Sequence, residues 1–100
     1  MGKNYKIRFE EEAYDQILDA LEFVSRVSAQ AAESLSEEII EQTKKLESFP
    51  NRFPVDKDYC VHNQEERKLT FQKGRYYILF VVEGDEVCIE YFADNRKKKW

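Results

Sequence analysis

The residues whose types could do chemistry gather in the last third of the sequence. They are eight cations and three tyrosines: Arg67, Lys68, Lys73, Arg75, Arg96, Lys97, Lys98 and Lys99, with Tyr76, Tyr77 and Tyr91. An arginine can bind a phosphate through two parallel hydrogen bonds, and a tyrosine can stack on a base or take part in proton transfer. Such a set could bind RNA and stabilise the charge that develops when a 2′-hydroxyl attacks its neighbouring phosphate, without a metal ion. The alternative is that the tyrosines fill the core or a sheet face, as strands favour, and that the lysine run is a solvated tail.

The charges are distributed unevenly along the chain. The net charge is −4, but residues 1–66 hold 8 basic and 15 acidic residues, whereas residues 67–100 hold 8 basic and 5 acidic ones. A contact with phosphates is therefore expected in the second part, because the first part would repel them. Both sets of charges could also be ordinary solubilising surface.

Other kinds of chemistry have little support in the sequence. His62 is the only histidine, and no HExxH, glycine-rich phosphate loop or EF-hand pattern occurs. Cys60 and Cys88 lack the CxxC spacing of a metal or redox site, so we expect reduced thiols, with a disulfide between them as the less favoured alternative. We therefore expect neither a metal nor a cofactor.

The length and composition predict one domain over residues 1–100. No apolar run has the length of a membrane span, and the first twelve residues lack the apolar core of a signal peptide. We expect a cytoplasmic protein with no membrane partner.

The positions of the candidate cations and tyrosines depend on the helices and strands that carry them. A strand is predicted at Tyr5 to Phe9, where apolar and basic residues alternate. A helix from Glu11 to Val27 follows, and a second helix begins after the N-cap Ser28 and ends at Phe49-Pro50. The expected apolar stripe of the first helix is Tyr14, Ile17, Leu18, Leu21 and Val24, continued by Val27. That of the second is Ala32, Leu35, Ile39 and Leu46, with Ile40 and Thr43 at the edge. The short connection predicts an antiparallel helical hairpin.

The rest of the chain is expected to form a β-meander. Its apolar runs are Leu69 to Phe71, Tyr76 to Val82 and Val87 to Ala93, separated by turns that contain Gly74 and Gly84. The central run is apolar at almost every position, so we expect both of its faces to be covered. Residues 55–66 are expected to be a loop, and Phe49 and Phe53 are expected to tuck under the helix end and the sheet edge. The predicted fold is α+β, in the order β-α-α-β-β-β, with an antiparallel sheet packed against the N-terminal helical hairpin.

Several short motifs in this order resemble a known group of proteins. They are LxxFPxxFP at Leu46 to Pro54, RKL at Arg67 to Leu69, GxYYILFxV at Gly74 to Val82, and IEYFADNR at Ile89 to Arg96, followed by a basic tail with tryptophan. This pattern is similar to the RelE/ParE superfamily of bacterial toxins from type II toxin–antitoxin modules, and the resemblance covers Tyr5 to Trp100.

The resemblance implies a compact toxin that is neutralised by a cognate antitoxin. Members of the RelE branch cleave mRNA in the ribosomal A site without a metal, using basic residues and often a tyrosine. Members of the ParE branch inhibit DNA gyrase. Carried over by position, the candidate catalytic residues are Arg67, Lys68, Arg75, Arg96 and Tyr91. The family commonly has an arginine where this chain has Tyr77.

Three functional hypotheses follow from the resemblance. The first, which we favour over the other two, is a RelE-like, ribosome-dependent endoribonuclease whose partners are the ribosome and mRNA. The second is a ParE-like protein that inhibits DNA gyrase by binding, which Tyr77 and the acidic helices favour. The third is a degenerate toxin-fold protein without catalysis. All three predict an exposed apolar surface for an antitoxin, which the sequence does not locate.

Overall fold

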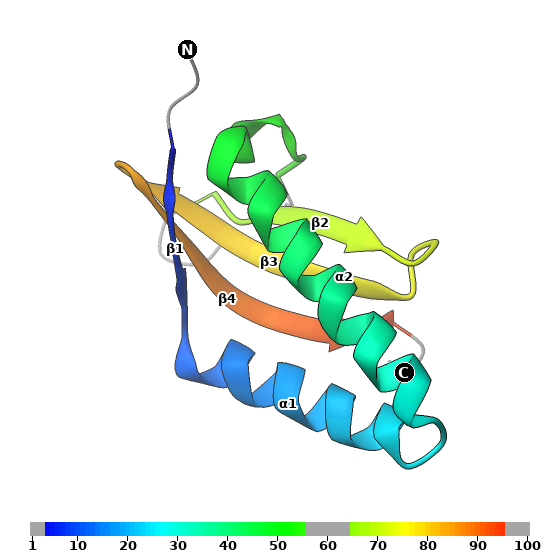
Figure 1. Cartoon of the computed structure of the whole chain (residues 1–100). Coiled ribbons are helices and arrows are strands. Elements are labelled where there is room, and N and C mark those ends of the chain that lie inside the picture. The colour runs from blue at the N-terminus through cyan, green and yellow to red at the C-terminus, as the bar shows by residue number, and fades with distance from the viewer. Residues whose placement is uncertain (1–3, 56–64, 96–100) are drawn as a thin grey trace.

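The computed structural model describes residues 4–55 and 65–95. Within them the elements are β1 (Lys6–Phe9), α1 (Glu11–Ser25), α2 (Ala29–Ser48), a short 3-10 helix η1 (Pro50–Arg52), β2 (Arg67–Phe71), β3 (Tyr76–Glu83) and β4 (Glu86–Asp94). The helices lie side by side on one face of the sheet (Figure 1). The α+β order predicted from the sequence is confirmed. In this part of the chain neither helix is long and apolar enough to cross a membrane.

The sheet has the strand order β1-β4-β3-β2. The three C-terminal strands form the expected antiparallel meander, with Gly74 and Gly84 at positive φ in its two turns. β1 pairs with β4 in parallel, from Lys6 opposite Glu86 to Phe9 opposite Ile89. The sheet is therefore mixed, and the expectation of a wholly antiparallel sheet is corrected for β1. The two helices form the connection that takes the chain from β1 at one edge to β2 at the other.

The core fills the space between the helices and the sheet. The sheet contributes Leu69, Phe71, Tyr76, Ile78, Phe80, Val87, Ile89 and Phe92, and the helices contribute Ala13, Ile17, Leu35, Ile39 and Leu46. The rings of Phe71, Tyr76 and Phe92 pack against one another, with centroid distances of 5.7 Å for Phe71–Tyr76, 5.6 Å for Tyr76–Phe92 and 6.3 Å for Phe71–Phe92. Tyr76 therefore packs in the core. This agrees with the alternative in which the tyrosines fill the core or a sheet face and have no chemical role.

The ends of the helices follow local chemistry. The Ser28 side chain accepts a hydrogen bond from the Ala31 backbone N–H at 3.1 Å, so the predicted N-cap is confirmed. α1 ends at Ser25, two residues before the predicted end. Phe53 packs edge-on against Phe80 with 6.0 Å between ring centroids, but Phe49 is 60% exposed. The expectation that both phenylalanines are tucked in is therefore wrong for Phe49, since the chain turns into η1 directly after it.

The apolar stripe predicted for α1 is wider than the surface that covers it. Ala13 and Ile17 are buried, whereas Tyr14 and Leu18 are 54% and 46% exposed. α1 packs over β4 and beside α2, and the Gln16 side chain accepts a hydrogen bond from the Phe92 N–H at 2.8 Å. This contact fixes the rotation of the helix, so that one side of the stripe faces away from the sheet.

A small polar cluster joins β1 to β4 on the face of the sheet that the helices do not cover. The Cys88 thiol donates to Glu10 Oε2 at 3.2 Å, and Arg8 Nη1 lies 3.3 Å from the same oxygen. Cys88 is a free, buried thiol, as expected; Cys60 lies outside the described residues. Burial, and then the hydrogen bond and the negative charge of Glu10, raise the pKa of Cys88 to about 12.

We predict that this thiol makes stability fall at alkaline pH. The unfolded thiol ionises near its ordinary pKa of 9.0, whereas the folded thiol stays protonated to about pH 12. Unfolding therefore releases a proton above pH 9, and the free energy of unfolding loses up to about 1.4 kcal/mol per pH unit until about pH 12. Urea unfolding between pH 8 and 11, in a Cys60→Ser background, measures this slope.

Cys88→Ala is the matched control for the slope, because it removes the buried thiol and leaves every other titratable residue in place. We expect it to be less stable at pH 7 but to lose less stability between pH 9 and 11. Parallel curves for the two proteins would contradict the prediction.

Candidate functional site

The face of the sheet away from the helices, here called the distal face, carries the side chains that alternate with the core residues. Its centre is apolar: Leu79, Val81 and Cys88 are each at most 3% exposed. Polar side chains flank this centre, with Lys68 from β2 on one side and Arg8 from β1 on the other. Both faces of β3 are therefore buried over most of its length, as predicted from its continuous apolar run.

A β-bulge turns Tyr91 onto the distal face. Leu79 pairs with Tyr91 and Phe80 pairs with Ile89, so Glu90 is an extra residue in β4. Tyr91 thereby reaches Tyr77, with ring centroids 6.2 Å apart. Because simple alternation from Ile89 would place Tyr91 in the core, its position depends on this bulge.

Lys68 completes a cluster with the two tyrosines. Its ammonium lies 4.5 Å from the centroid of the Tyr77 ring, a distance at which a cation is attracted to the face of an aromatic ring. Lys68 and Tyr91 are half-buried and Tyr77 is 3% exposed. In this group, here called the lysine–tyrosine cluster, the cation and the Tyr91 phenol are the parts accessible to an anion or a base, and Tyr77 is buried beside them. Tyr77 was one of the three tyrosines considered from the sequence, but it was not among the candidate catalytic residues. Its contacts depend on the register of β2 and on the bulge.

Arg67 has a structural role at the η1 turn, away from the lysine–tyrosine cluster. Its Nη1 donates to the backbone carbonyls of Phe53 at 2.7 Å and Asn51 at 3.2 Å, and its Nη2 lies 3.4 Å from Glu65. The side chain is only 19% exposed. Arg67 therefore holds the η1 turn against the start of β2 instead of pointing to the lysine–tyrosine cluster.

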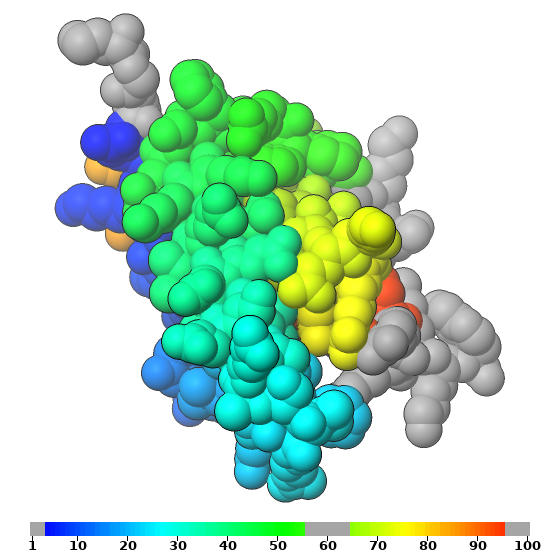
Figure 2. Space-filling model, turned by 45° about the vertical axis from the view of Figure 1, so that its right-hand side comes forward, coloured from blue at the N-terminus to red at the C-terminus, as the bar shows by residue number. Residues whose placement is uncertain are grey.

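Arg75 lies at the helix-covered side of the sheet, next to the β2–β3 turn. Its guanidinium stacks over the Tyr76 ring at 4.9 Å, and its Nη2 lies 3.6 Å from Asp94. It lines a pocket of about 350 Å³ with Phe23 and Val27. Figure 2 shows this turn, in yellow, beside α2, where the Gln72 side chain donates to Glu38 at 2.8 Å.

The structure thus brings together only part of the predicted set. Lys68 and Tyr91 share the distal face, and Arg67 and Arg75 do not join them. Arg96 lies outside the described residues, as do His62 and the lysine run of residues 97–99.

One further group has the composition of a metal site. The ligand atoms of Glu10, Cys88 and Glu90 lie within 4.8 Å of one another. The Arg8 guanidinium pairs with the carboxylate of Glu10, and the Cys88 thiol donates to the same carboxylate oxygen. These contacts make the group a charge-compensated junction between β1 and β4.

We predict that Arg67→Ala lowers the free energy of unfolding by about 2 kcal/mol, because it removes two hydrogen bonds from a charged donor to backbone carbonyls. Urea unfolding at pH 7 measures the change. Arg26→Ala is the matched control, since Arg26 forms a surface ion pair with Glu22 and its side chain is 73% exposed. It should change stability by less than about 1 kcal/mol. Equal effects of the two substitutions would show that Arg67 is not structural.

Comparisons with known proteins give a structural match. No protein-family model matches the sequence, and no curated protein does. A chain from a solved structure described as the chromosomal ParDE TA system from P. aeruginosa is similar, with a TM-score of 0.68 and 22% identity. The match covers 90% of this chain and 95% of that chain. At this identity the likeness concerns the fold, and the chain has the RelE/ParE-like fold that its motifs predicted.

Proposed function

We propose that this protein is the toxin component of a type II toxin–antitoxin module. The observation that carries the proposal is the fold, which is shared over nearly the whole length of both chains with a chain of a ParDE toxin–antitoxin system. The motifs from Leu46 to Arg96 support the same assignment independently, because they are sequence features of the superfamily.

We propose further that the toxin acts by binding its target, as in the ParE branch, with DNA gyrase as the target. Cleavage of RNA without a metal needs several cations that converge on one phosphate. Two of the candidates, Arg67 and Arg75, are held by Phe53, Asn51 and Asp94 at separate places. This separation favours binding over catalysis.

The lysine–tyrosine cluster favours a second candidate function. A cation beside two tyrosines on one sheet face suits an RNA nucleotide, with the phosphate at Lys68 and a base against Tyr91. With Arg96, which follows β4 in the sequence, this cluster would make a RelE-like, ribosome-dependent endoribonuclease. The two functions predict different effects in arrested cells: inhibition of gyrase supercoiling in one case and cleavage of mRNA in the other.

We predict that induced expression in a bacterial host arrests growth, and that purified protein in excess inhibits gyrase supercoiling. Primer extension on abundant mRNAs from the arrested cells should then show no cuts inside translated codons. Arrest with unimpaired supercoiling and such cuts would replace the gyrase proposal with the ribonuclease. The absence of arrest would favour the degenerate toxin-fold protein.

Lys68→Met tests the lysine–tyrosine cluster under the ribonuclease alternative. Methionine keeps an apolar side chain over Tyr77 but removes the charge, so codon cuts should fall by at least about 100-fold, the range for losing one donor to a developing charge. Arg96→Ala should abolish them. Lys6→Met is the matched control, because it removes an exposed lysine in β1. Cuts that persist in folded Lys68→Met would exclude the cluster as the catalytic site.

A further inference from the structure

A pocket with one apolar and one polar side opens between the α1–α2 connection and the β2–β3 turn. Its volume is about 350 Å³, at the lower end of the range for small-molecule sites. The hairpin supplies apolar side chains and the turn supplies polar ones. The residues that carry the argument are Phe23, Val24, Val27 and Leu35 from the hairpin, and Gln72 and Arg75 from the turn. We call this site the hairpin-end pocket.

The charge of the pocket comes from Arg75. Among the described residues, the lining has this one cation and no carboxylate. The guanidinium stacks over the Tyr76 ring, and its Nη2 lies 3.6 Å from Asp94 Oδ2, which is longer than a hydrogen bond. The Nε–H is shielded from solvent and has no hydrogen-bond partner in the described part of the chain. Arg75 therefore has donors that the fold leaves unsatisfied, and an acceptor in the pocket would satisfy them.

The β2–β3 turn holds Arg75 in place with a backbone that ordinary residues rarely adopt. Gln72 and Lys73 have φ values of 52° and 55°, in the left-handed region. Contacts from two other elements fix this turn: the Gln72 side chain donates to Glu38 on α2 at 2.8 Å, and the Asn95 N–H donates to the Arg75 carbonyl at 2.6 Å. Strained backbone persists where such contacts over-determine it, and it is concentrated at functional sites.

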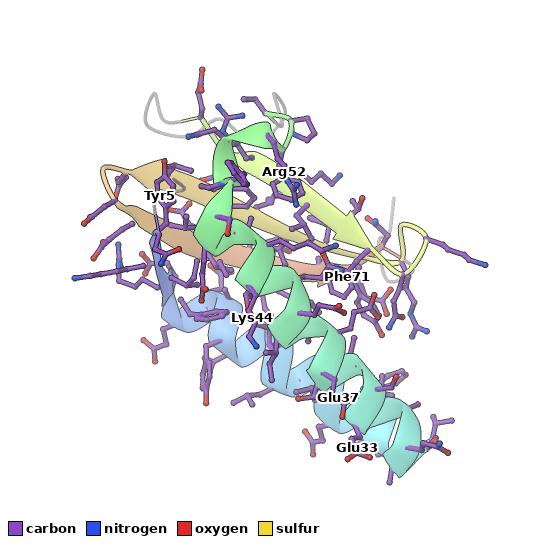
Figure 3. The ribbon with its side chains drawn as sticks, turned by 45° about the horizontal axis from the view of Figure 1, so that its top comes forward. Tyr5, Glu33, Glu37, Lys44, Arg52 and Phe71 are labelled. Carbon is purple, nitrogen blue, oxygen red and sulfur yellow. The ribbon has the colours of Figure 1, made fainter. Side chains whose placement is uncertain are left out.

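The hairpin forms the apolar side of the pocket. Leu35 is buried, whereas Phe23 and Val27 are 47% and 82% exposed. Figure 3 shows Glu33 and Glu37 on the same end of α2; both are exposed, and neither is part of the lining. The pocket therefore offers apolar surface to a hydrocarbon group and a single positive charge to the polar end of the same molecule.

A single carboxylate suits this pocket better than a phosphate does. A carboxylate carries one charge and can accept two parallel hydrogen bonds from a guanidinium. The second charge of a phosphate would find no further cation in the described lining. It would also be repelled by the carboxylates of Glu33 and Glu37 nearby on α2.

We propose that the hairpin-end pocket binds a small organic acid. The carboxylate pairs with Arg75, and an aromatic or branched aliphatic group packs against Phe23, Val24 and Val27. Such a ligand connects the hairpin to the β2–β3 turn. The inference does not rest on the proposed function, because the pocket and the lysine–tyrosine cluster lie on opposite faces of the sheet.

Titration of the full-length, isotope-labelled protein with phenylpropanoate tests the pocket. Proton–nitrogen correlation spectra report on the backbone amides and on the Arg75 Nε–H together. We expect saturable shifts at Gln72, Arg75 and Val27, with half-saturation at about 1 mM or below for a ligand of this size. Phenylpropanamide lacks the charge, propanoate lacks the ring, and phenyl phosphate has a second charge. Each should bind at least about tenfold more weakly.

Variants of the protein locate the site. Arg75→Met keeps an unbranched side chain over the Tyr76 ring but removes the charge, so it should weaken binding at least about tenfold. Val27→Asp should weaken binding about threefold and Val27→Lys should strengthen it about threefold, because position 27 is exposed and its charge is screened. The matched control is Arg26→Met, which removes an exposed cation outside the lining and should stay within about twofold of the wild type. Circular dichroism establishes that each variant is folded.

Four results would overturn the proposal: no saturable shifts in the wild type, equal binding of phenylpropanamide, unchanged binding by folded Arg75→Met, or equal effects of Val27→Asp and Val27→Lys. The carboxyl end of another chain offers the same chemistry as a free acid, so a tripeptide that ends in phenylalanine is titrated in parallel. Binding of the tripeptide without binding of phenylpropanoate would also exclude a free acid as the ligand.

Discussion

The parallel pairing of β1 with β4 is the constraint on which the rest of the structure depends. It is held at both ends, by hydrogen bonds from the Lys6 N–H to the Asp85 carbonyl at 2.9 Å and from the Glu10 N–H to the Ile89 carbonyl at 2.8 Å. Because β1 comes first in the chain and lies beside the last strand, α1 begins at the β1 edge of the sheet and packs over β4. The hairpin then crosses one face toward β2 at the other edge. This connection decides which sheet face becomes the core and which carries the lysine–tyrosine cluster.

The same constraint explains why only one side of the apolar stripe of α1 is buried. α1 covers β4 close to the β1 edge, so the sheet needs only the side of the helix that carries Ala13 and Ile17. Tyr14 and Leu18 lie beyond that contact and remain accessible. Burying a large apolar side chain contributes about 1.5–3 kcal/mol, so the exposed part of the stripe holds binding free energy that folding has not used. The hairpin can therefore support the fold on one side and a partner on the other.

Most of the fold could be predicted from the sequence, because local patterns determine it. Alternation indicated β1, apolar runs between glycine-containing turns indicated the meander, and Ser28 and Pro50 marked the beginning and end of α2. The candidate site could not be predicted equally well, because it depends on contacts between distant segments. No local pattern shows that the carbonyls of Asn51 and Phe53 meet Arg67, or that the bulge at Glu90 turns Tyr91 away from the core. Likewise, the apolar spacing of α1 predicts a helix but not which part of its stripe is covered.

The exposed apolar side chains of α1 and the lysine–tyrosine cluster lie on opposite sides of the sheet. Tyr14 and Leu18 belong to the helical layer, whereas Lys68, Tyr77 and Tyr91 occupy the distal face. A molecule bound to the helices would therefore leave the cluster uncovered, and the two surfaces can be tested independently by substitution.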